Sequence, residues 1–120
     1  VLVPQGRLVT VELIPVLADR AGTLLKELGY NNVEVKPAGP ALGCPERGPF
    51  DAIIVSAASP KLPEFLVSQL AVGGMLVIPV GTLEQQELLC ASRTDEGLSV
   101  RILGPCRFVP LIGREAFPKL

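Results

Sequence analysis

Apolar and polar residues follow two different periodicities along the chain, which predicts alternating strands and helices. Residues Arg7–Ile14 are rich in β-branched side chains and follow a turn with Pro and Gly, as expected of a buried strand. From Pro15 onward, leucine and alanine recur at helical spacing until Gly29, which predicts one amphipathic helix. A short strand is predicted at Asn32–Lys36. The first third of the chain is therefore predicted to fold as strand, helix, strand.

The middle of the chain predicts a second set of the same elements. A loop rich in proline and glycine runs from Pro37 to Pro49. Asp51–Ala57 is then almost continuously apolar, which is typical of a parallel strand buried on both faces. Pro63 can begin another helix, which we expect to continue to the glycine pair at Gly73, before a strand at Met75–Val80.

The last third of the chain changes to an antiparallel pattern. Gln86–Thr94 and Leu98–Leu111 flank a short turn containing Gly97, which predicts a hairpin with a bend near Gly104. Together the elements predict one α/β domain over residues 1–120, with an open, mostly parallel sheet that ends in this antiparallel hairpin. Ligands of such sheets bind beyond the carboxyl ends of the strands, where the loop Pro37–Pro49 lies. That loop is either a rigid support for a ligand or a plain surface connection.

Composition narrows the classes of function. The chain has 120 residues, 48% of them apolar, so we expect a core that does not depend on disulfides. Its net charge is -1 and its Lys and Arg are scattered, so we expect neither nucleic acid nor a membrane surface as a partner. No apolar run approaches the roughly 18 residues that a membrane span needs. Three cysteines without metal-binding spacing (Cys44, Cys90 and Cys106) favour a reducing cytoplasm. The absence of histidine excludes Ser-His-Asp and Cys-His nucleophile systems.

Several motifs together resemble the protein-L-isoaspartate O-methyltransferases. They are PFDAIIV, QL-x-x-GG and PVG within Gly43–Gly81, the glutamines of EQQELL, and FVPL within Cys106–Gly113. Arg7–Ala21 is similar to the strand and helix that follow the family's cofactor loop. The resemblance implies a Rossmann-like class I methyltransferase sheet and methylation of isoaspartyl carboxyls in damaged proteins, with S-adenosylmethionine as the cofactor. It implies isoaspartyl-containing proteins or peptides as partners.

The resemblance also implies roles for particular residues, but no catalytic side chain and no metal ligand. Glu12 corresponds to the acid that accepts hydrogen bonds from the cofactor ribose hydroxyls, a role that suits a carboxylate. Gly39 and Pro40 correspond to the turn beside the adenine, where the family has Gly-Asp-Gly; here the carboxylate is missing and Pro40 has no N–H to donate. The implied substrate-binding residues are Ser56, Ala57 and Ala58, beside the methyl-transfer site, and Phe108, Val109, Pro110 and Leu111, which line the peptide site.

Each of these positions also has an ordinary structural interpretation. A glutamate at a strand end is commonly solvated, small residues in a turn can serve tight packing, and a strand with a proline is typical of a sheet edge. Ser59 is expected to bond nearby backbone groups rather than to act in catalysis.

The family's glycine-rich cofactor loop has no counterpart in this sequence, because no GxGxG stretch occurs in it. The central first strand of the class, which lies between the equivalents of Arg7–Ile14 and Asp51–Ala57, is also missing. Its loss would remove roughly ten ladder hydrogen bonds, on the order of 10 kcal/mol, and split the sheet. We expect a truncated sequence or a fragment of a longer polypeptide; in the alternatives, the flanking strands pair with each other or a second chain supplies the element.

Two functions therefore stay open. The first is an isoaspartyl methyltransferase, of which these 120 residues alone would show little or no turnover. The second is a non-catalytic α/β module that acts through protein contacts. In both, exposed strand edges would allow a homo-oligomer to form.

Overall fold

The computed structural model describes residues 5–118. The chain divides into two compact units, which we call unit 1 (up to Cys44) and unit 2 (from Pro45). Within the described range, none of the helices has the length and apolar character that crossing a membrane requires. That the two units make up one domain stays a prediction.

Unit 1 consists of a two-stranded parallel sheet and one helix, β1 (Leu8–Glu12), α1 (Pro15–Glu27) and β2 (Val33–Pro37). The register runs from Leu8 opposite Val33 to Glu12 opposite Pro37. The predicted strand, helix and strand are all confirmed. The helix has a proline in its first turn and ends just before Gly29, whose φ of +86° allows the chain to reverse.

Few side chains of unit 1 are buried. Ala18, Leu42 and Cys44 are the buried apolar residues among those described. Many large apolar side chains are exposed instead: Leu8, Leu13, Ile14, Val16, Leu17, Leu24, Leu28 and Tyr30.

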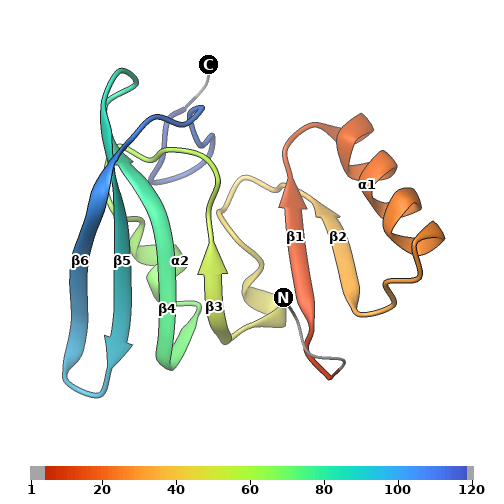
Figure 1. Ribbon diagram of the computed structural model, residues 1–120, viewed down its shortest axis with the longest axis horizontal. Helices are drawn as coiled ribbons and strands as arrows, with labels where there is room; N and C mark the ends of the chain where they lie inside the picture. The colour runs from red at the N-terminus through yellow and green to blue at the C-terminus, as the bar shows by residue number, and fades with distance from the viewer. Residues whose placement is uncertain (1–4, 119–120) are drawn as a thin grey trace. The chain divides into compact units, whose positions relative to one another are not determined.

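Unit 2 contains a four-stranded sheet in the order β3-β4-β5-β6 (Figure 1). β3 is parallel to β4, and β4, β5 and β6 are antiparallel, so the sheet of unit 2 is mixed and ends in the predicted C-terminal antiparallel hairpin. The hairpin closes with Thr94 opposite Gly97. The elements of unit 2 are the 3-10 helix Pro45–Arg47, β3 (Phe50–Ile54), α2 (Glu64–Val67), β4 (Leu70–Gly81), β5 (Gln86–Thr94) and β6 (Gly97–Cys106).

The predicted extent of the second helix is wrong. α2 has four residues, and β4 already begins at Leu70. Gly73, at a φ of +89°, and Gly74 form an irregularity within β4 instead of ending a helix. A Cβ at Gly74 would lie 3.0 Å from the backbone oxygens of Phe50 and Asp51, so glycine lets β4 approach β3 closely.

The expectation that β3 is buried on both faces is also wrong. Asp51, Ala52 and Ile54 are exposed, and the exposed fraction of Ile54 is 79%. β3 is an edge strand, because among the described strands it pairs with β4 alone, as β1 pairs with β2 alone. β1 and β3 thus belong to two different sheets.

The core of unit 2 is built from β4, β5 and α2. Leu70, Leu76, Ile78 and Ala91 are completely buried, and Leu66 of α2 is 3% exposed. Arg93 donates from Nη1 to the carbonyl oxygen of Leu70 at 2.6 Å, which fixes the start of β4 to β5. Unit 2 therefore has a core of its own.

Candidate functional site

The two predicted substrate-binding segments lie side by side in unit 2. The Ala58 N–H donates to the carbonyl oxygen of Val109 at 2.6 Å, and the Leu111 N–H donates to that of Ala58 at 2.7 Å. These bonds form a parallel bridge between Ala58 and Pro110. The small-residue turn after β3 is therefore joined directly to the extended segment after β6. Their role in binding a substrate stays a prediction.

A residue that sequence reasoning gave no role, Gln86, holds this segment in place. Its side chain is 1% exposed and contacts both backbone groups of Phe108. The Phe108 N–H donates to Oε1 at 2.6 Å, and Nε2 donates to the carbonyl oxygens of Thr82 and Phe108 at 2.8 and 3.3 Å. The side-chain amide of Gln86 thus makes the two hydrogen bonds that a neighbouring strand would make with the backbone of Phe108. The sequence feature that could have identified Gln86 is its position at the start of an apolar strand, within the EQQELL run that resembles the family.

The turn that contains Ala58 is fixed from behind by Ser59. Ser59 is completely buried, and its hydroxyl donates to the carbonyl oxygen of Lys61 at 2.6 Å, as the sequence analysis expected of a local backbone contact. Its N–H donates to the carbonyl oxygen of Pro79 at 3.0 Å, and its own carbonyl accepts from the Gly81 N–H. The turn is therefore attached to the end of β4.

Glu115 attaches the C-terminal segment to α2. One carboxylate oxygen accepts the Phe65 N–H at 2.9 Å, at the start of α2, and its carbonyl lies 3.4 Å from the Ser59 hydroxyl. Glu115 has a φ of +63°, a conformation that costs most residues about 1 kcal/mol or more. These contacts hold Glu115 in that conformation.

The seven predicted substrate-binding residues offer backbone and apolar surface, and none of them carries an ionisable side chain. Phe108 and Val109 are 37% and 69% exposed, whereas Ala58 is completely buried. A peptide could lie against the exposed apolar side chains of Phe108 and Val109, whereas the backbone groups of Phe108 are already bound by Gln86. Chemistry here would therefore depend on positioning, with no acid or base from these residues.

The predicted cofactor-binding residues belong to unit 1. Glu12 ends β1, and its Oε1 accepts the Ile14 N–H at 3.2 Å. Its backbone carbonyl accepts the Ala38 N–H at 2.9 Å, which brings the loop with Gly39 and Pro40 next to the strand end. The second carboxylate oxygen has no partner among the described residues; that it accepts from a cofactor ribose stays a prediction.

The loop beside Glu12 does not show a fit for adenine. Gly39 and Pro40 are exposed, and a Cβ built at Gly39 would meet nothing within 4 Å. No close approach of backbone to a ligand therefore requires glycine at this position, and Pro40 has no N–H. Their assignment to cofactor binding stays a prediction.

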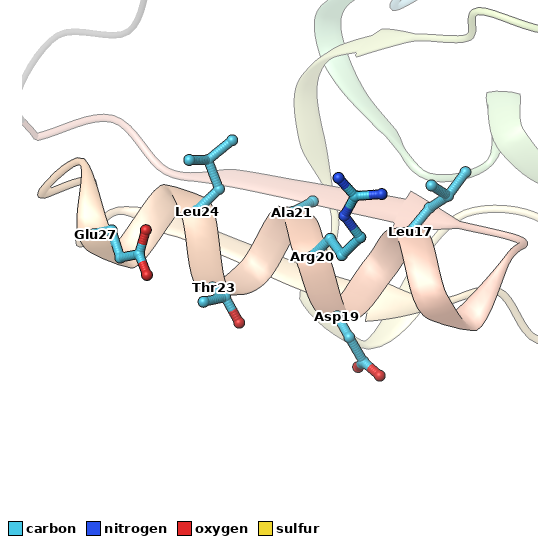
Figure 2. A pocket seen from close by; sticks show the side chains of 7 residues that line it. All are labelled: Leu17, Asp19, Arg20, Ala21, Thr23, Leu24 and Glu27. Carbon is cyan, nitrogen blue, oxygen red and sulfur yellow. The ribbon is translucent and has the colours of Figure 1, made fainter.

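A hollow along α1 does not add to the site (Figure 2). Figure 2 shows Asp19 and Thr23 pointing to the opposite side of the helix from Leu17 and Leu24. Side chains that diverge in this way cannot enclose a ligand. Within residues 5–118, no group of three or more His, Cys, Asp or Glu could hold a metal ion. The residues that line the hollow, all on α1, are Leu17, Asp19, Arg20, Ala21, Thr23, Leu24 and Glu27.

Comparisons with known proteins agree on one family. The family model described as protein-L-isoaspartate(D-aspartate) O-methyltransferase matches residues 1–116. The protein-L-isoaspartate O-methyltransferase of Methanopyrus kandleri is 47% identical over 116 residues, which cover 95% of this chain and 51% of that protein. One from Syntrophobacter fumaroxidans is 46% identical over 108 residues, 90% of this chain and 50% of the relative. The chain thus spans about half the length of the curated relatives it matches.

Solved structures give the same result for the fold. A protein-L-isoaspartate O-methyltransferase superposes with a TM-score of 0.82 at 26% identity, covering 94% of this chain and 36% of that one. A Plasmodium falciparum protein of the same description, in complex with S-adenosyl-L-homocysteine, gives a TM-score of 0.69 at 27% identity, covering 86% of this chain and 51% of that one. The split α/β sheet described above is therefore part of a methyltransferase fold.

Proposed function

Because the chain belongs to the protein-L-isoaspartate(D-aspartate) O-methyltransferase family, we propose that it supplies part of an enzyme that methylates isoaspartyl carboxyls in damaged proteins. The cofactor would be S-adenosylmethionine, and the partners would be isoaspartyl-containing proteins or peptides in the cytoplasm. Nucleic acid and membranes are not expected as partners.

One observation carries the proposal most directly, namely the way in which unit 2 holds the segment from Phe108 to Leu111. Gln86 binds both backbone groups of Phe108, and Ala58 binds Val109 and Leu111. A segment fixed in this way presents the exposed side chains of Phe108 and Val109 as an apolar surface against which a peptide of varied sequence can lie.

The residues of this chain would act by binding and orientation. Glu12 would hold the cofactor ribose, Phe108–Leu111 would hold the peptide, and the small residues Ser56–Ala58 would leave room for the reacting carboxylate. When bound, S-adenosylmethionine would supply an electrophilic methyl group. The isoaspartyl carboxylate is already ionised at neutral pH, so the transfer needs no general base and the absence of histidine is no obstacle.

Calorimetric titration with S-adenosylhomocysteine tests the cofactor assignment. Heat at micromolar ligand would support the assignment, and Glu12→Gln should then bind at least about tenfold more weakly, because a hydrogen bond to a charged acceptor is worth roughly 1.5–3 kcal/mol. Glu27→Gln, which removes the same charge from exposed α1, serves as the matched control and should bind as the parent does. Absence of heat up to millimolar ligand would contradict the proposal.

A non-catalytic module is the second candidate, because β1 and β3 belong to separate sheets and the sequence has no GxGxG loop. We expect little or no methyl incorporation into an isoaspartyl peptide by the 120 residues alone. Turnover in that assay would overturn this expectation. If neither heat nor turnover is found, the non-catalytic module is the function that stays open.

A further inference from the structure

The outer edge of the four-stranded sheet carries apolar side chains that do not belong to the site described above. Figure 1 shows β6 as the outermost strand of the sheet. Leu98, Val100 and Ile102 alternate along it and are 40%, 48% and 58% exposed. Val100 lies opposite Ala91, which is completely buried, so these three side chains continue the covered apolar face of the sheet. We call these three residues the β6 stripe.

The backbone of β6 can accept a further strand along the same stretch. The hairpin closes with Thr94 opposite Gly97 across a two-residue loop, and such a loop closes on a hydrogen-bonded pair. Because bonded and non-bonded pairs alternate in an antiparallel ladder, the N–H and C=O groups of the β6 stripe are directed away from β5. The residues that expose apolar side chains are therefore also those that present unused backbone groups.

The usual protection of a sheet edge is missing from this stretch. Natural edge strands carry prolines, lysines or bulges that prevent pairing with another chain. Between Leu98 and Ile102 there is no proline, lysine or register shift, and Arg101 is the one charged residue. Pro105 lies beyond the stripe. The edge is thus open to a strand of matching pattern.

We propose that β6 pairs with β6 of a second copy of this chain, antiparallel and in a register centred on Val100. Val100 then faces Val100 of the second copy, and Leu98 faces Ile102 of the second copy on either side. On the other face, Arg101 lies opposite Ser99 of the second copy, so the two like charges do not oppose each other. All three apolar residues of each copy meet an apolar partner.

Neighbouring registers fit less well, which is why the pattern selects a second copy in this register. Centring the pair on Arg101 would place the two guanidinium groups directly opposite each other. In an antiparallel pair, the residue numbers of two opposite residues have the same sum along the whole ladder. Centring the pair on Ser99 would therefore place Ile102 opposite Glu96 of the second copy. The register centred on Val100 avoids both mismatches.

The expected dimer is weak. One pair of short strands is smaller than a standard interface of about 800 Å² per partner, so we expect a dissociation constant in the micromolar range. Its formation does not depend on the proposed methyltransferase function, because neither Glu12 nor the Phe108–Leu111 segment takes part.

Sedimentation equilibrium of the chain at tens to hundreds of micromolar tests the proposal. We expect a monomer and dimer equilibrium, and a dissociation constant raised about tenfold or more by Val100→Arg, because two charges replace the central apolar pair. Ile54→Arg, at an exposed position of the opposite edge strand β3, serves as the control and should leave the equilibrium unchanged. A monomer throughout the range, or a dimer disrupted by Ile54→Arg and not by Val100→Arg, would overturn the proposal.

Cysteine crosslinking tests the register without depending on affinity. In the proposed pair the Cα atoms at position 100 lie about 5.5 Å apart, within the range that a disulfide spans, so Val100→Cys should form a covalent dimer under mild oxidation. Leu98→Cys should not, because its counterpart lies four residues along the strand. The unsubstituted chain, with its three native cysteines, is the control. Crosslinking of Ser99→Cys or Arg101→Cys in place of Val100→Cys would refute the register.

Discussion

The two units of this chain differ in how far each one completes its own core. Unit 2 has four strands and completely buried residues such as Leu76 and Ile78. Unit 1 has two strands and one helix, and it exposes large side chains such as Leu24 and Tyr30. Unit 1 buries few apolar side chains, so it gains less hydrophobic stabilisation than unit 2 does. The predicted peptide-binding residues therefore lie in the better supported unit, and the predicted cofactor-binding residues in the other.

The largest expected effect comes from removing a core side chain of unit 2. Leu76→Ala should lower the free energy of unfolding by about 2–5 kcal/mol, because it leaves a cavity at a completely buried position. The same substitution in unit 1, Leu24→Ala at a position that is 54% exposed, should cost less than about 1 kcal/mol. Urea denaturation of both variants measures the difference. Equal losses would remove the contrast between the units.

A somewhat smaller effect is expected at Gln86. Gln86→Met keeps the side-chain volume but leaves both backbone groups of Phe108 without their partner, so we expect a loss of about 2 kcal/mol. The neighbouring Gln85→Met, at an exposed position, should be close to neutral and is the matched control. Thermal unfolding compares the two. A shifted amide resonance of Phe108 in Gln86→Met, with no shift in the control, would show that the segment itself has moved.

The next effect separates a lost contact from backbone strain at Glu115. Both Glu115→Ala and Glu115→Gly remove the carboxylate that accepts the Phe65 N–H, but glycine tolerates the φ of +63°. We expect the alanine variant to be less stable than the glycine variant by about 1 kcal/mol in chemical denaturation. Equal stability would show that this conformation is not strained within unit 2.

The smallest effect on stability is expected at Glu12 in unit 1. Glu12→Gln should change the free energy of unfolding by less than about 0.5 kcal/mol, because the amide oxygen can still accept the Ile14 N–H at a partly exposed site. Circular dichroism during thermal unfolding measures it. A large loss would mean that Glu12 has a structural role, and weaker cofactor binding in that variant would then not identify a ligand.

The sequence predicted those parts of the fold that depend on local chemistry. Pro15 and Gly29 bracket the first helix, and the turn before Gly97 marks the hairpin, as observed. The glycine pair at Gly73 was misinterpreted as a helix end, because its actual role depends on the backbone of β3, which packs against Gly74. The exposure of β3 also depends on long-range pairing, because β3 pairs with β4 alone among the described strands. The local pattern of apolar residues carries no information about that pairing.

The candidate site was predictable to a similar extent. The resemblance to the family selected Ala58 and the Phe108–Leu111 segment, and the structure joins them by two backbone hydrogen bonds. The resemblance gave no role to Gln86. A glutamine at a strand end has no local sequence signature that tells whether its side chain is buried and bound to backbone groups or exposed to solvent. Only the three-dimensional structure shows that the amide of Gln86 hydrogen-bonds to both backbone groups of Phe108, just beyond the end of β6.

Native-state hydrogen exchange tests most directly that unit 2 is self-supporting and unit 1 is not. We expect amides that pair β1 with β2, such as those of Thr10 and Lys36, to open with a free energy at least about 2 kcal/mol below that of amides between β4 and β5. Amides at Leu76 and Ala91 should open only with global unfolding. Equal protection in both sheets would contradict the difference on which this interpretation depends.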